Sequence, residues 1–228
     1  MKIFKNLLTW VLFPIIIVGL AYAIVQSVMT PVTFNKVKEE RELVAIQRLK
    51  DIRTLQEAYK TETGRYAPVV DSLKKFYNED ELLVVMQIGS KDDSVAVANT
   101  AKLKKRNRRI KPEEMYKLYQ AGEKLVFEIQ NKVFVKDTLF NNRTDFHIDS
   151  IAFIPYCGDS IRMESIIRMV SGVKVPLFEA SIPYKSLLKG MNNQLRINLD
   201  DEREDSGRYP GLKVGSITAA NNNAGNWE

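Results

Sequence analysis

The sequence predicts an α+β protein in which an amino-terminal transmembrane helix continues as a long amphipathic helix packed on a mainly antiparallel β-sheet. Three observations predict this fold class. Residues 7–28 are uncharged and mostly apolar, an apolar stripe at helical spacing follows within residues 34–63, and the later chain holds short strand-like segments separated by turns. Most of these strands are joined without an intervening helix, which favours antiparallel pairing over a doubly wound sheet. The chain therefore divides into a membrane anchor (1–33), a stalk (34–63) and a globular head (64–228).

The apolar run of residues 7–28 is long enough to cross a bilayer, because a helix of this length spans about 30 Å. Lys2 and Lys5 precede the run and favour an amino end in the cytoplasm, which places the head in the periplasm or outside. Ala21-Tyr22-Ala23 has the small-x-small form of a signal-peptidase site, so a cleaved signal peptide is the alternative. The apolar run continues past this site to Met29, which favours a retained single-pass anchor.

The stalk carries one apolar stripe with spacings of three and four residues, formed by Ala45, Leu49, Ile52, Leu55 and Tyr59. Charged residues fill its other faces, so the stripe predicts a helix packed on the sheet of its own domain. The run is too short for several heptads, which disfavours a coiled coil. Gly64 stands where a left-handed carboxyl cap would end the helix.

The head is predicted to combine short helices with strands. Helices are expected at residues 71–76, 112–120 and 183–188. Strands are expected at residues 82–88, 146–154, 160–169, 173–182, 195–199 and 212–214, the first of them buried, and a hairpin is expected from 125–129 and 133–135. A long polar and basic loop is expected near 91–111, and residues 221–226 form a polar tail without periodicity.

The rare residue types restrict the chemistry. Cys157 is the only cysteine, which excludes an intrachain disulfide and favours a buried structural thiol. His147 is the only histidine, which excludes a two-histidine zinc site, and its alternating surroundings predict an ordinary strand residue. No Gly-x-Ser-x-Gly, P-loop or Gly-x-Gly-x-x-Gly pattern is present. The sequence therefore predicts a protein that is not an enzyme and has no cofactor.

One segment concentrates positive charge. Seven basic residues with no acidic residue among them lie between positions 102 and 111, namely Lys102, Lys104, Lys105, Arg106, Arg108, Arg109 and Lys111. They outnumber the formal net charge of +6, so the rest of the chain is nearly neutral. A solvated loop is one interpretation, and a surface for an acidic protein partner or anionic lipid is the other. The segment has no aromatic residue to stack on bases, which disfavours nucleic acid.

Acidic residues cluster in a second segment that is expected to be a loop. The candidate ligands for a cation such as Ca²⁺ are Asp200, Asp201, Glu204 and Asp205. Carboxylate oxygens are suitable ligands for Ca²⁺, but the spacing differs from that of an EF-hand and Arg203 lies among them. A solvated loop is therefore favoured over a cation site.

Two short motifs, one at the end of the stalk and one at the end of the chain, carry a family resemblance. The first reads Tyr59-Lys60-Thr61-Glu62-Thr63-Gly64-Arg65-Tyr66-Ala67-Pro68, and the second reads Gly225-Asn226-Trp227. The first resembles the junction that ends the first helix of type II secretion pseudopilins, which are type IV pilin-like proteins, with one alanine inserted before the proline. The second resembles the carboxyl end of many major pseudopilins. The resemblance implies a helix–sheet junction at Tyr59, Gly64, Arg65 and Tyr66.

The chain departs from this family's pattern in three places. It lacks the prepilin-peptidase site, a glycine followed by Phe or Met, and it has no acidic residue between Met1 and Lys38 to register subunits in a filament. Asn221-Asn222-Asn223 stands where the family has an acidic calcium loop. What the resemblance implies is thus a membrane-anchored, non-enzymatic structural or assembly subunit of a cell-envelope complex, in contact with other envelope proteins or further copies of itself. The alternative function is an anchored adaptor that uses the basic segment to bind an acidic partner or anionic lipid.

Overall fold

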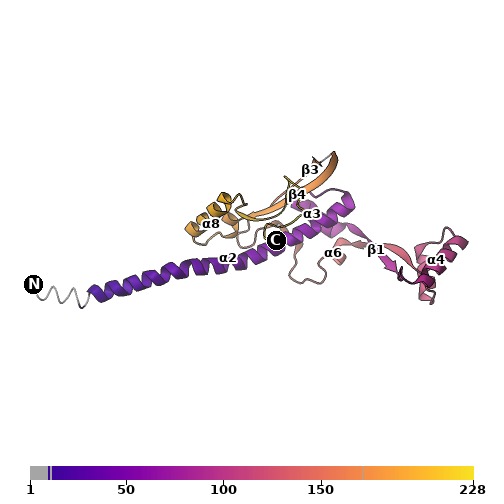
Figure 1. Cartoon of the computed structure of the whole chain (residues 1–228), viewed down its shortest axis with the longest axis horizontal. Helices are drawn as coiled ribbons and strands as arrows, with labels where there is room; N and C mark the ends of the chain where they lie inside the picture. Colours follow the sequence, from indigo (N-terminus) through magenta and orange to yellow (C-terminus); the bar gives the residue numbers. More distant parts are fainter. Residues whose placement is uncertain (1–9, 11, 171) are drawn as a thin grey trace, which may run out of the picture.

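The chain folds as an elongated α+β structure. The computed structural model describes residue 10, residues 12–170 and residues 172–228. In chain order its helices and strands are α2 (Phe13–Thr63), α3 (Val70–Glu79), β1 (Glu81–Ile88), α4 (Ser94–Arg106), α5 (Pro112–Gln120), β2 (Phe127–Phe134), α6 (Val135–Thr138), the 3-10 helix η2 (Ile148–Ala152), β3 (Arg162–Val170), β4 (Val173–Pro183), α7 (Tyr184–Leu187), α8 (Asn193–Asp205) and β5 (Gly211–Gly215). The amino-terminal half of α2 forms one end of the molecule and a small unit containing α4 forms the other (Figure 1).

The predicted anchor and stalk form one continuous helix. α2 has 51 residues, so it is roughly 75 Å long at 1.5 Å per residue. It continues through Pro31, and the hydroxyl of Thr30 donates to the carbonyl of Gln26 at 2.7 Å. The helix ends at Gly64, whose φ of 75° and N–H bond to the carbonyl of Lys60 confirm the predicted left-handed cap.

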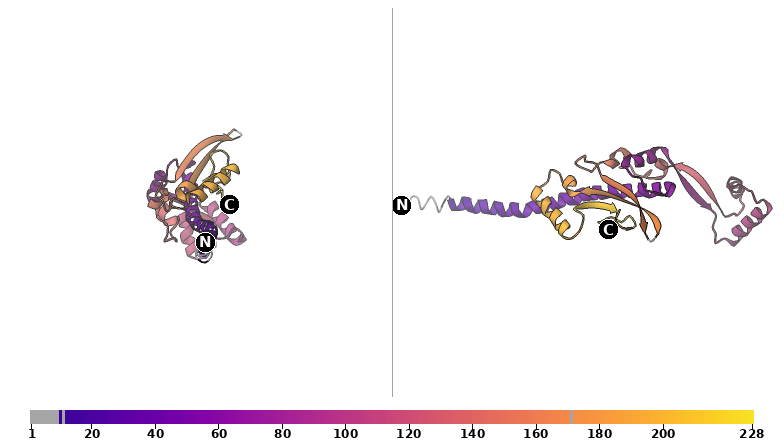
Figure 2. Two further views of the ribbon diagram at one scale, coloured as in Figure 1. Left: turned by 90° about the vertical axis from the view of Figure 1, so that its left-hand side faces the viewer. Right: turned by 90° about the horizontal axis from the view of Figure 1, so that it is seen from above.

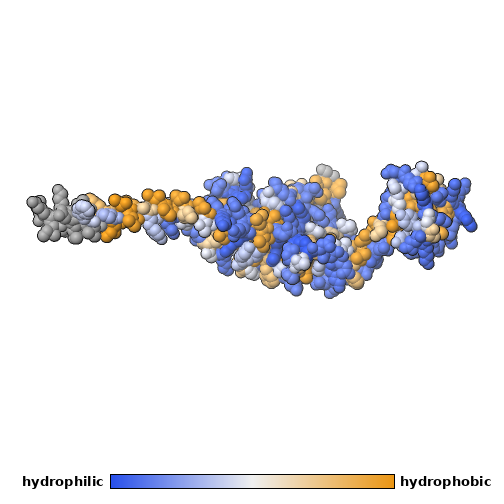
Figure 3. All heavy atoms as spheres, turned by 90° about the horizontal axis from the view of Figure 1, so that it is seen from below, coloured by the Kyte–Doolittle hydropathy of each residue, from blue (hydrophilic) through white to orange (hydrophobic). Residues whose placement is uncertain are grey.

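The two halves of α2 have different surroundings. The amino-terminal half is long and apolar enough to cross a membrane, and none of its most apolar window is buried within the molecule. A signal sequence would have the same length and composition. Figure 3 shows this half as a bare apolar rod. In the carboxyl-terminal half, the predicted stripe is confirmed, because Ala45, Leu49, Ile52 and Leu55 are fully buried and Tyr59 is partly buried.

A three-stranded antiparallel sheet in the order β3-β4-β5 covers this buried face of α2. Arg162 pairs with Ser181 between β3 and β4, and Glu179 pairs with Gly215 between β4 and β5. All three strands were predicted from the sequence. Fully buried Phe178 and Ile182 from β4 join the helix residues in the main core, and Figure 2 shows the sheet lying along the helix.

A two-stranded ribbon carries a second, smaller unit away from the head. β1 and β2 pair antiparallel from Glu81↔Phe134 to Ile88↔Phe127. The chain between them folds into α4 and α5 around a core of Met115, Leu125 and Phe127, which we call the distal module (Figures 1 and 2). The expected hairpin at 125–135 is therefore wrong, because β2 runs straight through its polar middle. The expected burial of β1 is also wrong, because a two-stranded ribbon leaves most of its side chains exposed.

Two segments expected to be a loop or a strand are helices instead. The basic segment lies on α4 and on the connection to α5, not in a loop throughout. α4 forms because the carboxylate of Asp93 caps its start, accepting the N–H groups of Val95 and Ala96 at 2.9 and 3.2 Å. Residues 195–199 belong to α8, which Asn192 caps in the same way at 3.1 Å.

The segment of residues 146–154 also differs from the expected strand. It contains η2 and contributes only an isolated bridge between Phe153 and Ser160. His147 therefore stands at the amino-terminal end of a 3-10 helix, without a side-chain capping bond, and is not a strand residue. Cys157 is partly rather than fully buried in the turn that follows, so its expected burial is not reached.

Candidate functional site

The helix–sheet junction is built from two aromatic contacts on either side of a tight turn. The ring of Tyr59 meets Phe76 edge-on, with centroids 5.2 Å apart, and the ring of Tyr66 lies 4.8 Å from that of Phe178. Gly64 supplies the left-handed turn between them. Arg65 is exposed, and its carbonyl accepts a hydrogen bond from the hydroxyl of Thr63 at 2.9 Å. The turn therefore returns the chain to the core without needing a ligand.

A buried glutamine that the sequence analysis overlooked fastens this turn. Gln56 is fully buried on α2, and its amide bonds both backbone groups of Ala67, accepting from the N–H at 2.8 Å and donating to the carbonyl at 3.0 Å. Ala67 is itself fully buried, so these two groups have no access to water. The available signal was its position, since Gln56 lies four residues after Ile52 on the apolar face.

The polar tail folds back onto the same junction. The side-chain amide of Asn223 donates to the hydroxyl of Tyr66 at 2.9 Å and to a carboxylate oxygen of Glu57 at 3.3 Å. Arg53 of α2 donates to the carboxylate of Glu228 at 2.7 Å. The hydroxyl of Tyr66 is therefore bonded to the tail. The residues that flank the second motif therefore bind the end of α2 and the turn after it.

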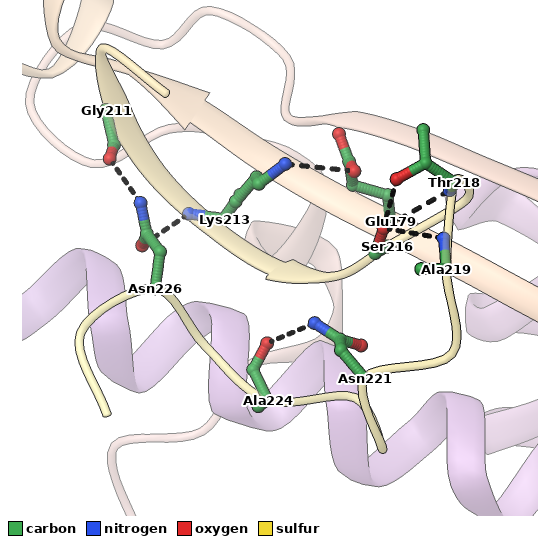
Figure 4. Close-up of polar contacts among 9 residues, drawn as sticks. All are labelled: Glu179, Gly211, Lys213, Ser216, Thr218, Ala219, Asn221, Ala224 and Asn226. Atoms are coloured by element: carbon green, nitrogen blue, oxygen red, sulfur yellow. Dashed lines mark hydrogen bonds and ion pairs between the residues drawn. The ribbon is translucent and has the colours of Figure 1, made fainter. Parts of the chain in front are cut away.

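The Gly-Asn-Trp motif has a specific structural role beside β5 (Figure 4). The side-chain amide of Asn226 accepts from the N–H of Lys213 at 3.0 Å and donates to the carbonyl of Gly211 at 2.9 Å, so it behaves like a short extra strand. A Cβ on Gly225 would lie 2.4 Å from the indole ring of Trp227, so only glycine allows the ring to fold back here. Trp227 in turn packs against the main core.

Three arginines of α2 bind backbone carbonyl groups of the head instead of facing only water. Arg41 donates to the carbonyls of Leu187 and Lys189 at 2.9 and 3.0 Å, and Arg48 donates to that of Phe153 at 2.8 Å. Arg53 donates to the carbonyl of Asn223 at 3.3 Å, in addition to its bond to the Glu228 carboxylate. The charged faces of the stalk are therefore also packing faces.

A partly buried polar cluster joins α2, α7 and α8. The fully buried Tyr184 donates its hydroxyl proton to Glu42 and accepts from Arg203 at 3.2 Å. Burial, together with the neighbouring Glu42 carboxylate, raises the pKa of the Tyr184 hydroxyl above its ordinary value. Tyr184 belongs to the main core, so the cluster ties α7 and α8 to α2 at the edge of that core.

The seven basic residues of the predicted segment form a distal basic surface. All of them are exposed, and none makes an ion pair with another described residue. Lys102, Lys104, Lys105 and Arg106 end α4, where the negative end of the helix dipole favours them. The surface belongs to the distal module, at the opposite end of the molecule from the apolar half of α2 (Figures 1 and 3).

The four acidic candidates lie on α8 and not on a loop. Asp200 is ion-paired with Arg196, and burial raises the pKa of the Asp200 carboxyl. Asp201, Glu204 and Asp205 are exposed. Among the described residues, no three His, Cys, Asp or Glu side chains gather closely enough to hold a metal ion.

Comparisons of the chain with protein-family models, with curated proteins and with solved structures found no match. Function is therefore inferred from the geometry of this chain. That geometry defines an α+β protein built on one long, half-bare helix.

Proposed function

We propose that the protein is a single-pass, membrane-anchored and non-enzymatic subunit that helps to build or organise a cell-envelope assembly, with a pilin-like plan. The observation that carries this proposal is the continuity of α2. The same helix offers an exposed apolar half of membrane-spanning length and, without a break, the buried stripe of the head. Any force on the head is therefore transmitted directly to the anchor, which suits a structural subunit more than a freely tethered domain.

The tail adds support because Asn223 and Glu228, which stand on either side of the Gly-Asn-Trp motif, bind the carboxyl-terminal part of α2 and the turn that follows it. The Gly64-Arg65-Tyr66 turn and the tail from Asn223 to Trp227 hold each other through the contacts of Tyr66. The tail contacts the turn after α2 through Asn223 and β5 through Asn226, so it ties the helix to the sheet. We infer an amino end in the cytoplasm and a head on the far side of the membrane, as Lys2 and Lys5 favour.

Fractionation and thiol labelling test the anchor and its orientation. The protein should stay in the membrane fraction after carbonate and high-salt washes. Lys105→Cys in a Cys157→Ser background should react with a membrane-impermeant maleimide added to intact cells whose outer barrier is permeabilised. Extraction by carbonate would remove the proposal's basis, and labelling only after cell lysis would reverse the orientation. An amino-terminal mass measurement separates the retained anchor from cleavage after Ala23.

A second candidate function is an anchored adaptor that binds an acidic protein through the distal basic surface. Its support is the set of seven exposed cations without ion-pair partners, carried on a ribbon away from the anchor. The lipid alternative is less favoured for this surface, because the ribbon carries it away from the membrane that α2 would occupy (Figure 1).

Neutralisation of three exposed cations tests the adaptor function. The variant Lys104→Gln/Lys105→Gln/Arg108→Gln should lose salt-sensitive partners in pull-downs from detergent-solubilised membranes. At physiological salt a surface charge acts over only about 8 Å, so an ionic partner has to lie close to these side chains. Partners of the wild-type protein should be acidic proteins. Unchanged partners in the variant would refute the adaptor function, and retention of nucleic acid instead of protein would replace the partner class.

A further inference from the structure

A cationic cavity lies where the head approaches the membrane half of α2. The chain turns from α7 into α8 at the end of the head nearest the bare apolar rod (Figures 1 and 2). This turn, residues 184–196, is called the elbow below. The cavity has a volume of about 510 Å³ and is lined by elbow residues together with Asp159, Arg162 and Pro183.

The charge of this cavity is strongly positive. Four cations line it, Arg162, Lys185, Lys189 and Arg196, against one carboxylate, Asp159. Arg196 is already paired with Asp200. Lys189 approaches Asp159 only at 3.9 Å, with both side chains largely exposed, and such a pair contributes little. Three cations therefore remain available to an anionic ligand.

An apolar groove adjoins the cavity on the side of α2. It has a volume of about 360 Å³ and lies between Met29, Phe34 and Val37 of α2 and the elbow residue Met191. Met191 also lines the cationic cavity, so this residue belongs to the lining of both spaces. A ligand that filled both would need an anionic head and an apolar chain.

The position of the groove along α2 agrees with the headgroup layer of a membrane. Residues 29–35 extend the uncharged run beyond the span predicted for 7–28, adding about 10 Å along the helix. One headgroup layer is roughly 5–8 Å thick. The elbow is fixed to α2 about 9 Å beyond this stretch, where Arg41 binds the carbonyls of Leu187 and Lys189.

We propose that the elbow binds the phosphate headgroup of an anionic phospholipid whose acyl chains follow α2 into the bilayer. This inference rests on the proposed membrane anchoring. Arg162, Lys185 and Lys189 donate hydrogen bonds to phosphate oxygens, which accept charge-assisted bonds well. The lipid then fixes the height and tilt of the head above the membrane.

Competition between lipids of different charge tests the inference on the full-length protein. The protein is incorporated into nanodiscs containing equal amounts of phosphatidylglycerol and phosphatidylcholine. After release into mild detergent, the retained lipids are counted by native mass spectrometry. Each cation near an anionic surface contributes about fivefold to binding. The variant Arg162→Gln/Lys185→Gln/Lys189→Gln removes three such cations, so it should lower the retained ratio of phosphatidylglycerol to phosphatidylcholine by up to roughly a hundredfold.

The matched control is Lys104→Gln/Lys105→Gln/Arg108→Gln, which removes the same charge at the far end of the molecule and should keep the wild-type ratio. Lys185→Gln alone, at an exposed position, covers the case in which the triple variant does not fold. The inference is overturned if the elbow variant retains the wild-type ratio, or if the wild type retains both lipids equally. Complete displacement of the lipid by millimolar inorganic phosphate would assign a free-phosphate site instead. Failure of the wild type to enter nanodiscs would refute the anchor itself, whereas entry without lipid preference would refute only this inference.

Discussion

The substitution Gln56→Leu should destabilise the head by removing the bonds that hold the turn after α2. Gln56 makes two hydrogen bonds to the buried backbone of Ala67, at 2.8 and 3.0 Å. Each unsatisfied buried group costs about 1–3 kcal/mol, and leucine recovers part of this by apolar burial. We expect a net loss of about 3 kcal/mol in the free energy of unfolding. For a chain of this size, that corresponds to a fall of roughly 6–12 °C in Tm.

Circular dichroism melting of the full-length protein in mild detergent measures this loss. Hydrogen exchange adds a local readout, because the amide of Ala67 should lose its protection. Gln120→Leu, the same substitution at an exposed helix position, is the control and should leave Tm within about 2 °C. A Gln56→Leu variant that melts with the control would show that the two bonds do not hold the turn.

The isosteric substitution Gln56→Glu distinguishes lost hydrogen bonds from lost packing through its pH dependence. The introduced carboxyl can donate to the carbonyl of Ala67 only when it is protonated. Burial raises its folded-state pKa above the unfolded value of about 4.3. Its stability is therefore complete below that value and is lost as pH rises through the folded-state pKa. The Tm deficit should be larger at pH 8 than at pH 5, and an equal deficit at both values would contradict the role of the donated bond.

Three further predictions concern the turn, the stalk and the buried tyrosine. Gly64→Ala should cost about 1–2 kcal/mol by melting, because φ is +75° there, although no atom lies within 4 Å of the added Cβ; an unchanged Tm would show that the cap is not strained. A chain beginning at Phe34 should be soluble and should melt in one cooperative transition. A chain beginning at Arg65 lacks the buried stripe and should precipitate or bind hydrophobic dye. Equally cooperative melting of both chains would show that the stalk is a free tether. The raised pKa of Tyr184 means that the stability from its neutral hydroxyl is present below about pH 10 and is lost as pH rises above it. Tyr184→Phe should reduce the alkaline loss of stability measured by melting between pH 8 and pH 11, and an alkaline loss equal to that of the wild type would assign the effect to another group.

The proposals divide the molecule into a membrane end and a partner end. The elbow adjoins the apolar half of α2 through Met191 and Asn192, and the distal basic surface lies across the ribbon from it. The two triple variants therefore serve as controls for each other. Loss of lipid without loss of partner in one, and the reverse in the other, would assign a separate role to each end.

The elements determined by the sequence alone are those whose signals are local and of sufficient length. The apolar run needs only its length and lack of charge, and the stripe from Ala45 to Tyr59 needs only helical spacing. Gly64 marks the helix end because left-handed φ favours glycine. Strands β3, β4 and β5 follow from apolar segments with turns between them, since consecutive strands commonly pair.

Some helix and strand assignments failed where a short pattern fits two structures. Residues 195–199 alternate between apolar and polar, as a strand does, but Leu195 and Leu199 are also one helical turn apart. The cap at Asn192 and the pair of Arg196 with Asp200 favour the helix. The basic composition of α4 similarly concealed a helix that the Asp93 cap and the basic last turn could have revealed.

Only the tertiary structure decided which distant segments meet. β1 and β2 pair although the entire distal module lies between them in the sequence. The sequence of either strand does not identify the other as its partner, because strand pairing depends on chain closure as well as composition. Three other contacts likewise depend on how the chain returns to α2. They are the contacts of Asn223 in the tail, the bonds of Gln56 to Ala67, and the position of Met191 in the lining of both the cationic cavity and the apolar groove. A sequence records the donors, acceptors and apolar groups, whereas the folded chain decides which of them come within bonding distance, because those contacts form between residues far apart in the sequence.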